Sequence, residues 1–247
     1  MSERVKIILD KNADILRLPA IALRGLVVFP GNIIHFEVGR KKSIAAIEWA
    51  MSNNNAVFLT AQQDMDVEDP GFKDLYAYGV VAEVKQVLRV SDELVKVLVE
   101  GKYRAKLLTL DSSGRFLLAS TKAAALRGTK SVDSARVEAL VRSVKEAFEE
   151  YLSLNPRLSK DVVYTIITNE DAALLCDYIP ANLLLKYTDK QALLNEGTVS
   201  GRLEKLLEIL RRETKILHIE KDIQSKVNEQ MDKNQRDYYL REQMRAI

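Results

Sequence analysis

The side chains best suited to bind metals or to act as nucleophiles are few in this sequence: His35, His218 and Cys176. Neither histidine has a second histidine or a cysteine at the spacing of a metal site. The cysteine follows two leucines in an apolar stretch, with no basic residue or histidine beside it. These residues therefore predict a buried, inert thiol and two histidines without a metal-binding or catalytic role.

The acidic stretch DMDVEDPG, residues 64–71, has the alternating carboxylates of a calcium-binding loop. Its sixth position is Asp69 where a glycine is required, and its twelfth is Leu75 where a glutamate is required. We therefore interpret this stretch as a solvated turn with its corner at Pro70 and Gly71.

Motifs for nucleotide phosphates, dinucleotides and serine nucleophiles do not occur in the 247 residues. The stretch GTVSG, residues 197–201, resembles a serine-nucleophile motif only loosely. It predicts instead a helix end at Gly197 and a helix cap at Thr198 or Ser200. We expect no catalytic residue, no metal site and no cofactor within this chain.

Composition places the chain among ordinary globular proteins, with 47% hydrophobic and 29% charged residues. A net charge of +2 is too balanced to predict nucleic-acid binding. No run of about 18 apolar residues predicts a membrane span, and residues 1–14 lack the apolar centre of a signal peptide. A single cysteine excludes an internal disulfide. A cytoplasmic protein is the expectation.

Residues 1–124 alternate between apolar and polar residues as β-strands do. In IIHFEV, residues 33–38, every second side chain is apolar and shares one face. Hairpin turns are predicted near residues 91–93 and 111–114. One helix interrupts the strands after residue 40, with Ile44, Ile47 and Met51 forming its apolar stripe. This pattern predicts a small, partly closed barrel.

Residues 125–199 change to helical periodicity and predict a small helical bundle. A long helix is expected before Pro156, which would end it. Two shorter helices are expected to be capped by Ser159 and Asn169. The fold class is therefore α+β: a β-rich barrel, a helical bundle and then a long helix.

Residues 200–247 predict one long helix, because no glycine or proline follows Gly201. Residues 202–247 would span roughly 70 Å at about 1.5 Å per residue. Apolar residues expected to pack are Leu203, Leu206, Leu207, Leu210, Leu217, Ile223 and Val227. Apolar anchors become sparse afterwards, so the helix is expected to fray beyond about residue 225. No stop signal precedes Ile247, which predicts that the helix continues in a longer chain.

Binding and positioning, rather than catalysis, are the functions that this composition favours, and the balanced charge favours an apolar binding surface. Two candidate surfaces are the tip of the predicted hairpin and a pair of tyrosines at the start of the same strand. They comprise Leu88, Val90 and Leu94, and Tyr76 and Tyr78. The alternative that each is an ordinary core or edge residue stays open.

Four stretches resemble the Lon family of ATP-dependent proteases, in the family's order and over almost the whole chain. They are LPAIALRGLVVFPGNIIHFEVGRKKSI (18–44), VKVLVEGKYRAKL (95–107), DKQALLN (189–195) and QRDYYLREQMRAI (235–247). The family usually has proline where this chain has His35, so the pairing of that strand could differ.

This resemblance implies that the chain is the amino-terminal substrate-recognition region of a larger protease. Its β-rich part would match the family's PUA-like pseudo-barrel. The full-length protein would be a cytoplasmic, homohexameric AAA+ ring that uses ATP and magnesium to unfold damaged or regulatory proteins. It would cleave them at a Ser–Lys dyad that lies outside these residues. No membrane or nucleic-acid partner is expected for this region.

Two other interpretations remain open at this stage. The region could chiefly assemble or gate the ring, with contacts near the end of the chain. Those contact residues would be Tyr238, Tyr239, Glu242, Met244 and Arg245. Alternatively, the chain could be a stand-alone adaptor that shares the same module.

Overall fold

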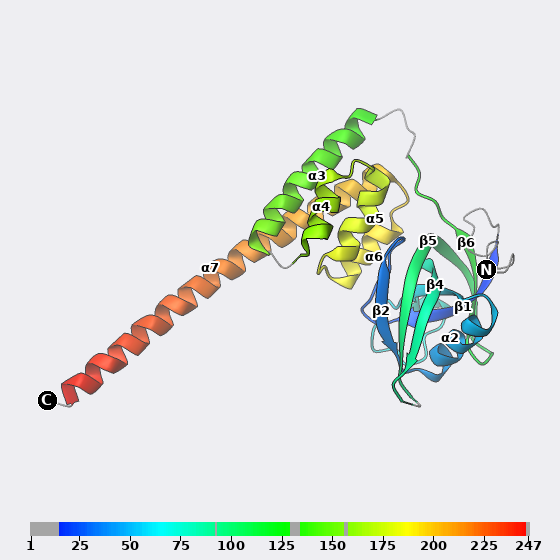
Figure 1. Cartoon of the computed structure of the whole chain (residues 1–247), viewed down its shortest axis with the longest axis horizontal. Helices are drawn as coiled ribbons and strands as arrows, with labels where there is room; N and C mark the ends of the chain where they lie inside the picture. Colours follow the sequence, from blue (N-terminus) through cyan, green and yellow to red (C-terminus); the bar gives the residue numbers. More distant parts are fainter. Residues whose placement is uncertain (1–14, 92, 129–133, 156–157, 246–247) are drawn as a thin grey trace.

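The computed structural model describes residues 15–91, 93–128, 134–155 and 158–245. A barrel and a group of helices lie side by side, and one helix extends far from both (Figure 1). This arrangement confirms the predicted α+β class with a β-rich first part, a helical second part and a long last helix. None of the described helices combines the length and the apolar composition needed to cross a membrane.

Six strands form the barrel. They are β1 (Leu16–Leu23), β2 (Ile33–Val38), β3 (Ala56–Ala61), β4 (Tyr78–Arg89), β5 (Val95–Asp111) and β6 (Leu117–Ala123). Strand β1 runs parallel to β3, and the other pairs are antiparallel. A short 3-10 turn, η1 (Phe72–Asp74), precedes β4.

The long strand β5 closes the barrel because it pairs with different partners along its length. Its first part, residues 95–100, pairs with β2, and its last part, residues 105–111, pairs with β6. Strands β5, β4, β3, β1 and β6 thus form a ring, and β2 is attached to it as an edge strand. Both predicted hairpins, β4–β5 and β5–β6, are confirmed.

Strand β3 is buried on both faces, which explains why all of its residues except Thr60 are apolar. Val57 and Leu59 belong to one apolar cluster, whereas Ala56 and Phe58 belong to another on the opposite face. The first cluster also contains Ile44 and Ile47 of α2 (Lys41–Asn53) and continues into the helices. Met51 was predicted to share this stripe, but 44% of it is exposed.

Four short or medium helices form the bundle. They are α3 (Ser134–Leu154), α4 (Lys160–Thr168), α5 (Ala172–Asn182) and α6 (Tyr187–Asn195). The predicted cap of α4 is confirmed, because Ser159 Oγ accepts from Val162 N. The predicted break at Pro156 lies outside the described residues.

The predicted cap of α5 is wrong: Asp171 caps this helix, not Asn169. The Asp171 carboxylate accepts from the backbone N–H groups of Ala173 and Leu174. The Asn169 side chain instead accepts from the N–H of Asp171 and forms the turn that precedes the helix. Two cap-forming residues two positions apart made the sequence ambiguous.

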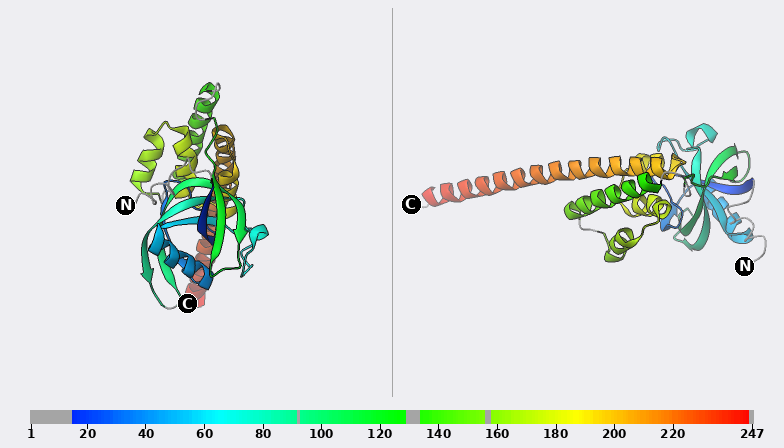
Figure 2. Two further views of the ribbon diagram at one scale, coloured as in Figure 1. Left: turned by 90° about the vertical axis from the view of Figure 1, so that its right-hand side faces the viewer. Right: turned by 90° about the horizontal axis from the view of Figure 1, so that it is seen from above.

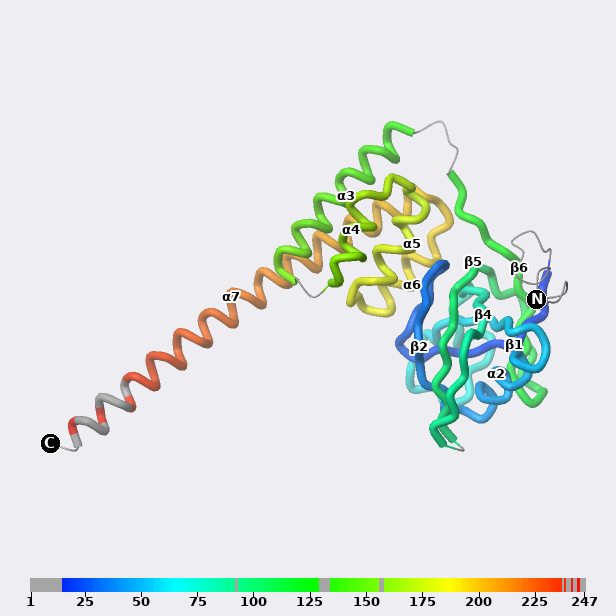
Figure 3. Tube along the Cα trace, in the orientation of Figure 1, coloured from blue at the N-terminus to red at the C-terminus, as the bar shows by residue number. Residues whose placement is uncertain are grey.

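The last helix, α7 (Val199–Arg245), is continuous as predicted, and Thr198 Oγ1 accepts from Gly201 N at its start. Its first part packs beside α3, with Leu203, Leu206 and Leu210 fully buried. Figures 2 and 3 show the remainder extending beyond α3 without a neighbouring element. Ile223 and Val227 were expected to pack, but they are 56% and 46% exposed. The prediction was wrong because α3 does not reach them.

Two buried arginines join the barrel to the helices. Arg104 of β5 donates to the carbonyls of Leu194 and Asn195, at 2.5 and 2.8 Å, and to that of Ala124. Arg202 of α7 donates to the carbonyls of Glu196 and Leu194 and forms an ion pair with Asp177. Both guanidinium groups therefore bind the turn between α6 and α7, which fixes that turn against β5.

Candidate functional site

The tip of the β4–β5 hairpin exposes apolar side chains at the end of the barrel away from the helices. Leu88 and Val90 are 58% and 52% exposed. Leu94 is half-buried, and its carbonyl accepts from Val90 N at 3.0 Å. Exposed β-branched and leucine side chains on a hydrogen-bonded turn form a surface that another apolar chain can cover.

Helix α2 and the β5–β6 turn lie at this same end of the barrel (Figure 1). The Glu48 carboxylate of α2 accepts from Arg89 of the hairpin at 2.7 Å and from Arg115 of the turn at 3.2 Å. The rings of Trp49 and Phe116 lie 5.7 Å apart. We call this region the hairpin-end surface. Its apolar members are Trp49, Met51, Leu88, Val90, Leu94 and Phe116.

Tyr76 and Tyr78 lie at the opposite end of β4, so the structure does not bring them near the hairpin tip. Ten residues of strand separate Tyr78 from Leu88, or roughly 33 Å in an extended strand. The Arg104 guanidinium lies over the Tyr78 ring, 3.9 Å from its centroid, and Gln191 of α6 donates to the Tyr78 carbonyl. These tyrosines therefore lie at the junction with the helices.

Tyr76 is half-buried at this junction, and burial together with Tyr187 of α6 raises the pKa of its phenol. The Tyr187 hydroxyl donates to the Gln63 carbonyl at 3.2 Å. A cavity of about 700 Å³ lies nearby between the barrel and the helices, lined by residues that include Tyr103, Leu126 and Leu174. Leu174 is 39% exposed at its edge.

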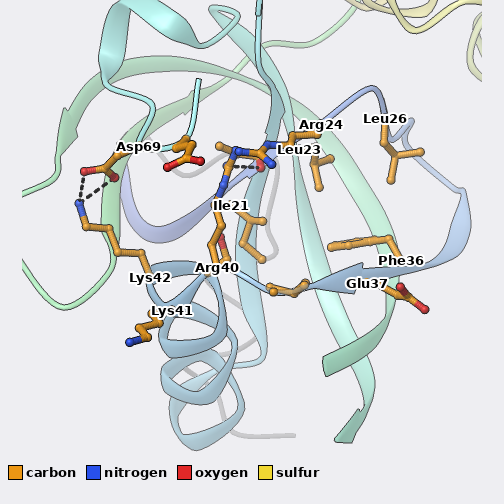
Figure 4. Close-up of a pocket in the computed structure, with 15 residues that line it drawn as sticks. Ile21, Leu23, Arg24, Leu26, Phe36, Glu37, Arg40, Lys41, Lys42 and Asp69 are labelled. Atoms are coloured by element: carbon orange, nitrogen blue, oxygen red, sulfur yellow. Dashed lines mark hydrogen bonds and ion pairs between the residues drawn. The ribbon is translucent and has the colours of Figure 1, made fainter. Parts of the chain in front are cut away.

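A larger cavity, of about 820 Å³, lies where β1 and β2 separate (Figure 4). Strand β1 lines it with Ile21 and Leu23, and β2 lines it with Phe36. Arg24 and Arg40 lie at its centre. Sequence reasoning missed this cavity because its cations stand 16 positions apart. The basic run in GRKKS, residues 39–43, was the available signal.

The residues first considered for chemistry do not converge. Within the described part of the chain, no group of three or more His, Cys, Asp or Glu side chains could hold a metal ion. Cys176 is fully buried, and burial raises the pKa of its thiol to about 12, so the predicted inert thiol is confirmed. His218 Nε2 lies 3.8 Å from a Glu150 carboxylate oxygen on the surface of α7 and α3.

Of the predicted contacts near the chain's end, two have described side chains. Tyr238 and Met244 are 67% and 79% exposed on α7. The side chains of Tyr239, Glu242 and Arg245 lie outside the described residues, although their backbone belongs to α7.

Residues 17–212 match the family model described as the ATP-dependent protease La (LON) substrate-binding domain. The chain belongs to this family. The match begins in β1 and ends within α7, so it covers the barrel, the cavity between β1 and β2, the bundle and the packed part of the last helix.

The curated relatives that this chain resembles are named Lon protease. The chain is 38% identical to Lon protease of Heliobacterium modesticaldum over 247 residues, 100% of this chain and 30% of that protein. It is 38% identical to Lon protease of Escherichia coli over 237 residues, 96% of this chain and 30% of that protein. The chain thus spans about 30% of the length of these relatives.

Solved structures of Lon amino-terminal domains share the fold. The N-terminal domain of Mycobacterium avium complex Lon protease superposes with a TM-score of 0.64 at 20% identity. The match covers 79% of this chain and 98% of that one. A Lon N-terminal domain protein from Xanthomonas campestris gives 0.55 at 15% identity, covering 78% and 98%. At these identities the likeness supports the fold alone.

Proposed function

We propose that this chain receives unfolded or damaged polypeptides for an ATP-dependent Lon protease and binds them at the hairpin-end surface. We call such a polypeptide a client. The observation that carries the proposal is the exposure of apolar side chains at that end in a chain of the LON substrate-binding domain family. Leu88, Val90, Trp49 and Met51 are between 37% and 58% exposed.

An apolar surface suits such clients because unfolding exposes their apolar segments. Contacts of a few exposed side chains are weak, since burying about 100 Å² of apolar area contributes roughly 2.5 kcal/mol before the cost of association. Weak contacts allow many different sequences to bind. Several copies of the domain on one ring would add avidity to each contact.

The full-length protein that we propose is a cytoplasmic homohexamer whose other domains bind ATP and magnesium and cleave clients at a Ser–Lys dyad. Within the chain we propose three parts. Residues 1–124 bind clients, residues 125–199 form a helical bundle that supports this client-binding part, and residues 200–247 connect to the ATPase module. Tyr76 and Tyr78 remain a second, separate candidate for client contact. Their half-buried position at the junction makes them the weaker candidate.

A binding assay with one test protein in two forms examines the proposal directly. A fluorescently labelled protein is presented either native or permanently unfolded by reduction and alkylation. We expect the unfolded form to bind this chain and the native form not to bind it. Equal binding of both forms, or binding of neither, would contradict the proposal.

A specific observation favours a second function, assembly of the ring. From Ile216 onward, α7 carries exposed apolar residues at helical spacing, which form a stripe on one side. They are Ile216, Ile219, Ile223, Val227, Met231 and Tyr238, each between 38% and 67% exposed. Light scattering over a range of concentrations separates the two functions. Self-association at micromolar concentration that Ile223→Ser abolishes would favour assembly, and a monomer at all concentrations would not.

A further inference from the structure

The cavity between β1 and β2 combines an open strand edge with excess positive charge. Strand β2 pairs with β5 on one side, and no described strand pairs with its other side. Strand β1 pairs with β6 only up to Ala20 and with β3 beyond it, so residues 21–23 also lack a neighbour on the cavity side. An extended polypeptide can pair with such an edge through its backbone.

Two arginines at the centre of this cavity take part in no ion pair among the described residues. Arg40 donates only to neutral acceptors, namely the carbonyls of Ala22 and Val67 and the side chain of Gln62. Arg24 donates only to the Val67 carbonyl, at 3.3 Å. Burial and the neighbouring Arg24 charge lower the pKa of Arg40 and outweigh the opposing effect of Asp69 and Glu68.

The amino end of α2 faces the same space. Arg40 precedes this 13-residue helix, whose start has no side-chain cap and no acidic residue in its first turn. The first N–H groups of a helix have no partner within it and carry partial positive charge. Ser43, in that first turn, lines the cavity and is only 6% exposed.

The carboxylates that line the cavity do not cancel this charge. Asp69 is held by Lys42 at 2.9 Å (Figure 4), and Glu37 lies 3.3 Å from Lys96. Of the carboxylates that line the cavity, Glu68 alone has no ion pair among the described residues. Three of the lining cations, Arg24, Arg40 and Lys41, also have none. The surplus favours an anion, and a guanidinium pair matches the geometry of a carboxylate.

Apolar residues lie on the side of the cavity away from Lys42 and Asp69 (Figure 4). Leu26 and Phe36 are half-buried there, beside the buried Leu23 and Val38. A ligand with a carboxylate at one end and apolar side chains before it would satisfy both sides. A phosphate ion would leave the apolar side uncovered.

We propose that this cavity binds the free carboxyl terminus of an extended client, with its last apolar residues over Leu26 and Phe36 and its carboxylate at Arg24 and Arg40. Pairing with the open edge of β2 holds the client backbone. The inference rests on the proposed client-binding function and adds to it a site that recognises chain ends.

The test compares two fluorescein-labelled peptides of the same sequence, with apolar residues at the carboxyl end. One ends in a free acid and the other in an amide. We expect the amide to bind about tenfold more weakly, because a charge-assisted contact to arginine is lost. Equal affinity of the two peptides would overturn the inference. So would an amidated peptide with a terminal glutamate that binds as tightly as the free acid.

Variants assign the effect to this cavity. Arg24→Gln changes an exposed side chain and is expected to remove most of the acid–amide difference. Glu68→Gln, also exposed, is expected to tighten binding of the acid severalfold by removing a repelling charge. Arg142→Gln is the control for loss of an exposed arginine, because Arg142 lies on α3 outside both proposed surfaces with its side chain 75% exposed, and it is expected to change nothing. Equal losses in Arg24→Gln and Arg142→Gln would refute the assignment.

The unfolded test protein separates this inference from the proposed function. If that protein binds and the acid and amide peptides do not differ, recognition of chain ends is wrong and client binding stands. If the unfolded protein also fails to bind, the proposed function itself is wrong.

Discussion

The two ends of strand β4 differ in what covers them. At Tyr78, helix α6 and the Arg104 guanidinium close the end with hydrogen bonds and a cation–π contact. At Leu88, the same strand ends in a hairpin where Leu88 and Val90 are 58% and 52% exposed. Aromatic residues at the first end looked as suitable for binding as the aliphatic ones at the second. The tertiary neighbour, not the residue type, therefore determines which apolar residues remain available.

Substitutions at the covered end of β4 should lower the free energy of unfolding more than substitutions at the open end. We expect Arg104→Met to lower the free energy of unfolding by about 3 kcal/mol, because three carbonyls lose a buried charged donor. Urea unfolding followed by circular dichroism measures this loss. Arg115→Met at the exposed end should change stability by less than about 0.5 kcal/mol. Similar losses in both variants would remove the contrast between the two ends.

The open end should respond in binding rather than in stability. We expect Val90→Asp or Leu88→Asp to weaken binding of an unfolded client about tenfold, or about 1.4 kcal/mol, with an unchanged circular dichroism spectrum. Ser91→Asp is the matched control, since it adds the same charge at the hairpin tip and removes no apolar side chain. Anisotropy titrations compare the three. Unchanged affinity in the first two variants would exclude the hairpin tip.

Helix α7 shows the same contrast between covered and uncovered parts. Deleting residues 219–245 should change the free energy of unfolding by less than about 1 kcal/mol, because Ile219, Ile223 and Val227 stay about half exposed in the folded chain. Amide exchange should be slow from 203 to 217 and fast beyond about residue 225. Strong protection between 230 and 245 in a monomer would contradict this expectation.

A surface ion network on the barrel should contribute the smallest effect. Hydrogen bonds from Lys102 and Lys85, at 2.6 and 2.8 Å, outweigh burial and lower the pKa of Glu100. The carboxylate therefore stabilises the fold above its unfolded pKa of 4.5, and this contribution is lost as the pH falls through the lower folded pKa.

We expect Glu100→Gln to lower stability at neutral pH by a few tenths to about 1 kcal/mol. Its stability should also fall less steeply than that of the unaltered chain between about pH 5 and pH 3. Thermal unfolding across this range tests both statements, and parallel pH profiles would show that the network contributes nothing.

Local patterns predicted the elements well because they report which faces are apolar. Alternation located β2 and the β4–β5 hairpin, and the absence of glycine and proline gave the continuous helix α7. Patterns could not show that β5 exchanges partners along its length to close the barrel, since that depends on contacts distant in sequence. They failed likewise at Met51, Ile223 and Val227, which are apolar yet uncovered.

The candidate site was predicted only in part for the same reason. Leu88 and Val90 were singled out as a hairpin tip and are exposed there. Trp49 and Met51 were not, because α2 reaches that end only once Ile44 and Ile47 pack into the core of the barrel. Arg24 and Arg40 meet only after β1, β2 and α2 are assembled. The spacing of these two arginines in the sequence therefore does not predict that they lie together.

Clients that bind at the open end of the barrel should perturb its NMR spectrum. The isotopically labelled chain is titrated with one protein, first native and then permanently unfolded. We expect shifts only with the unfolded form, at residues 88–94, in the second half of α2 and at the β1–β2 cavity. Shifts confined to the helices, or none with either form, would contradict this expectation and identify the chain as a scaffold.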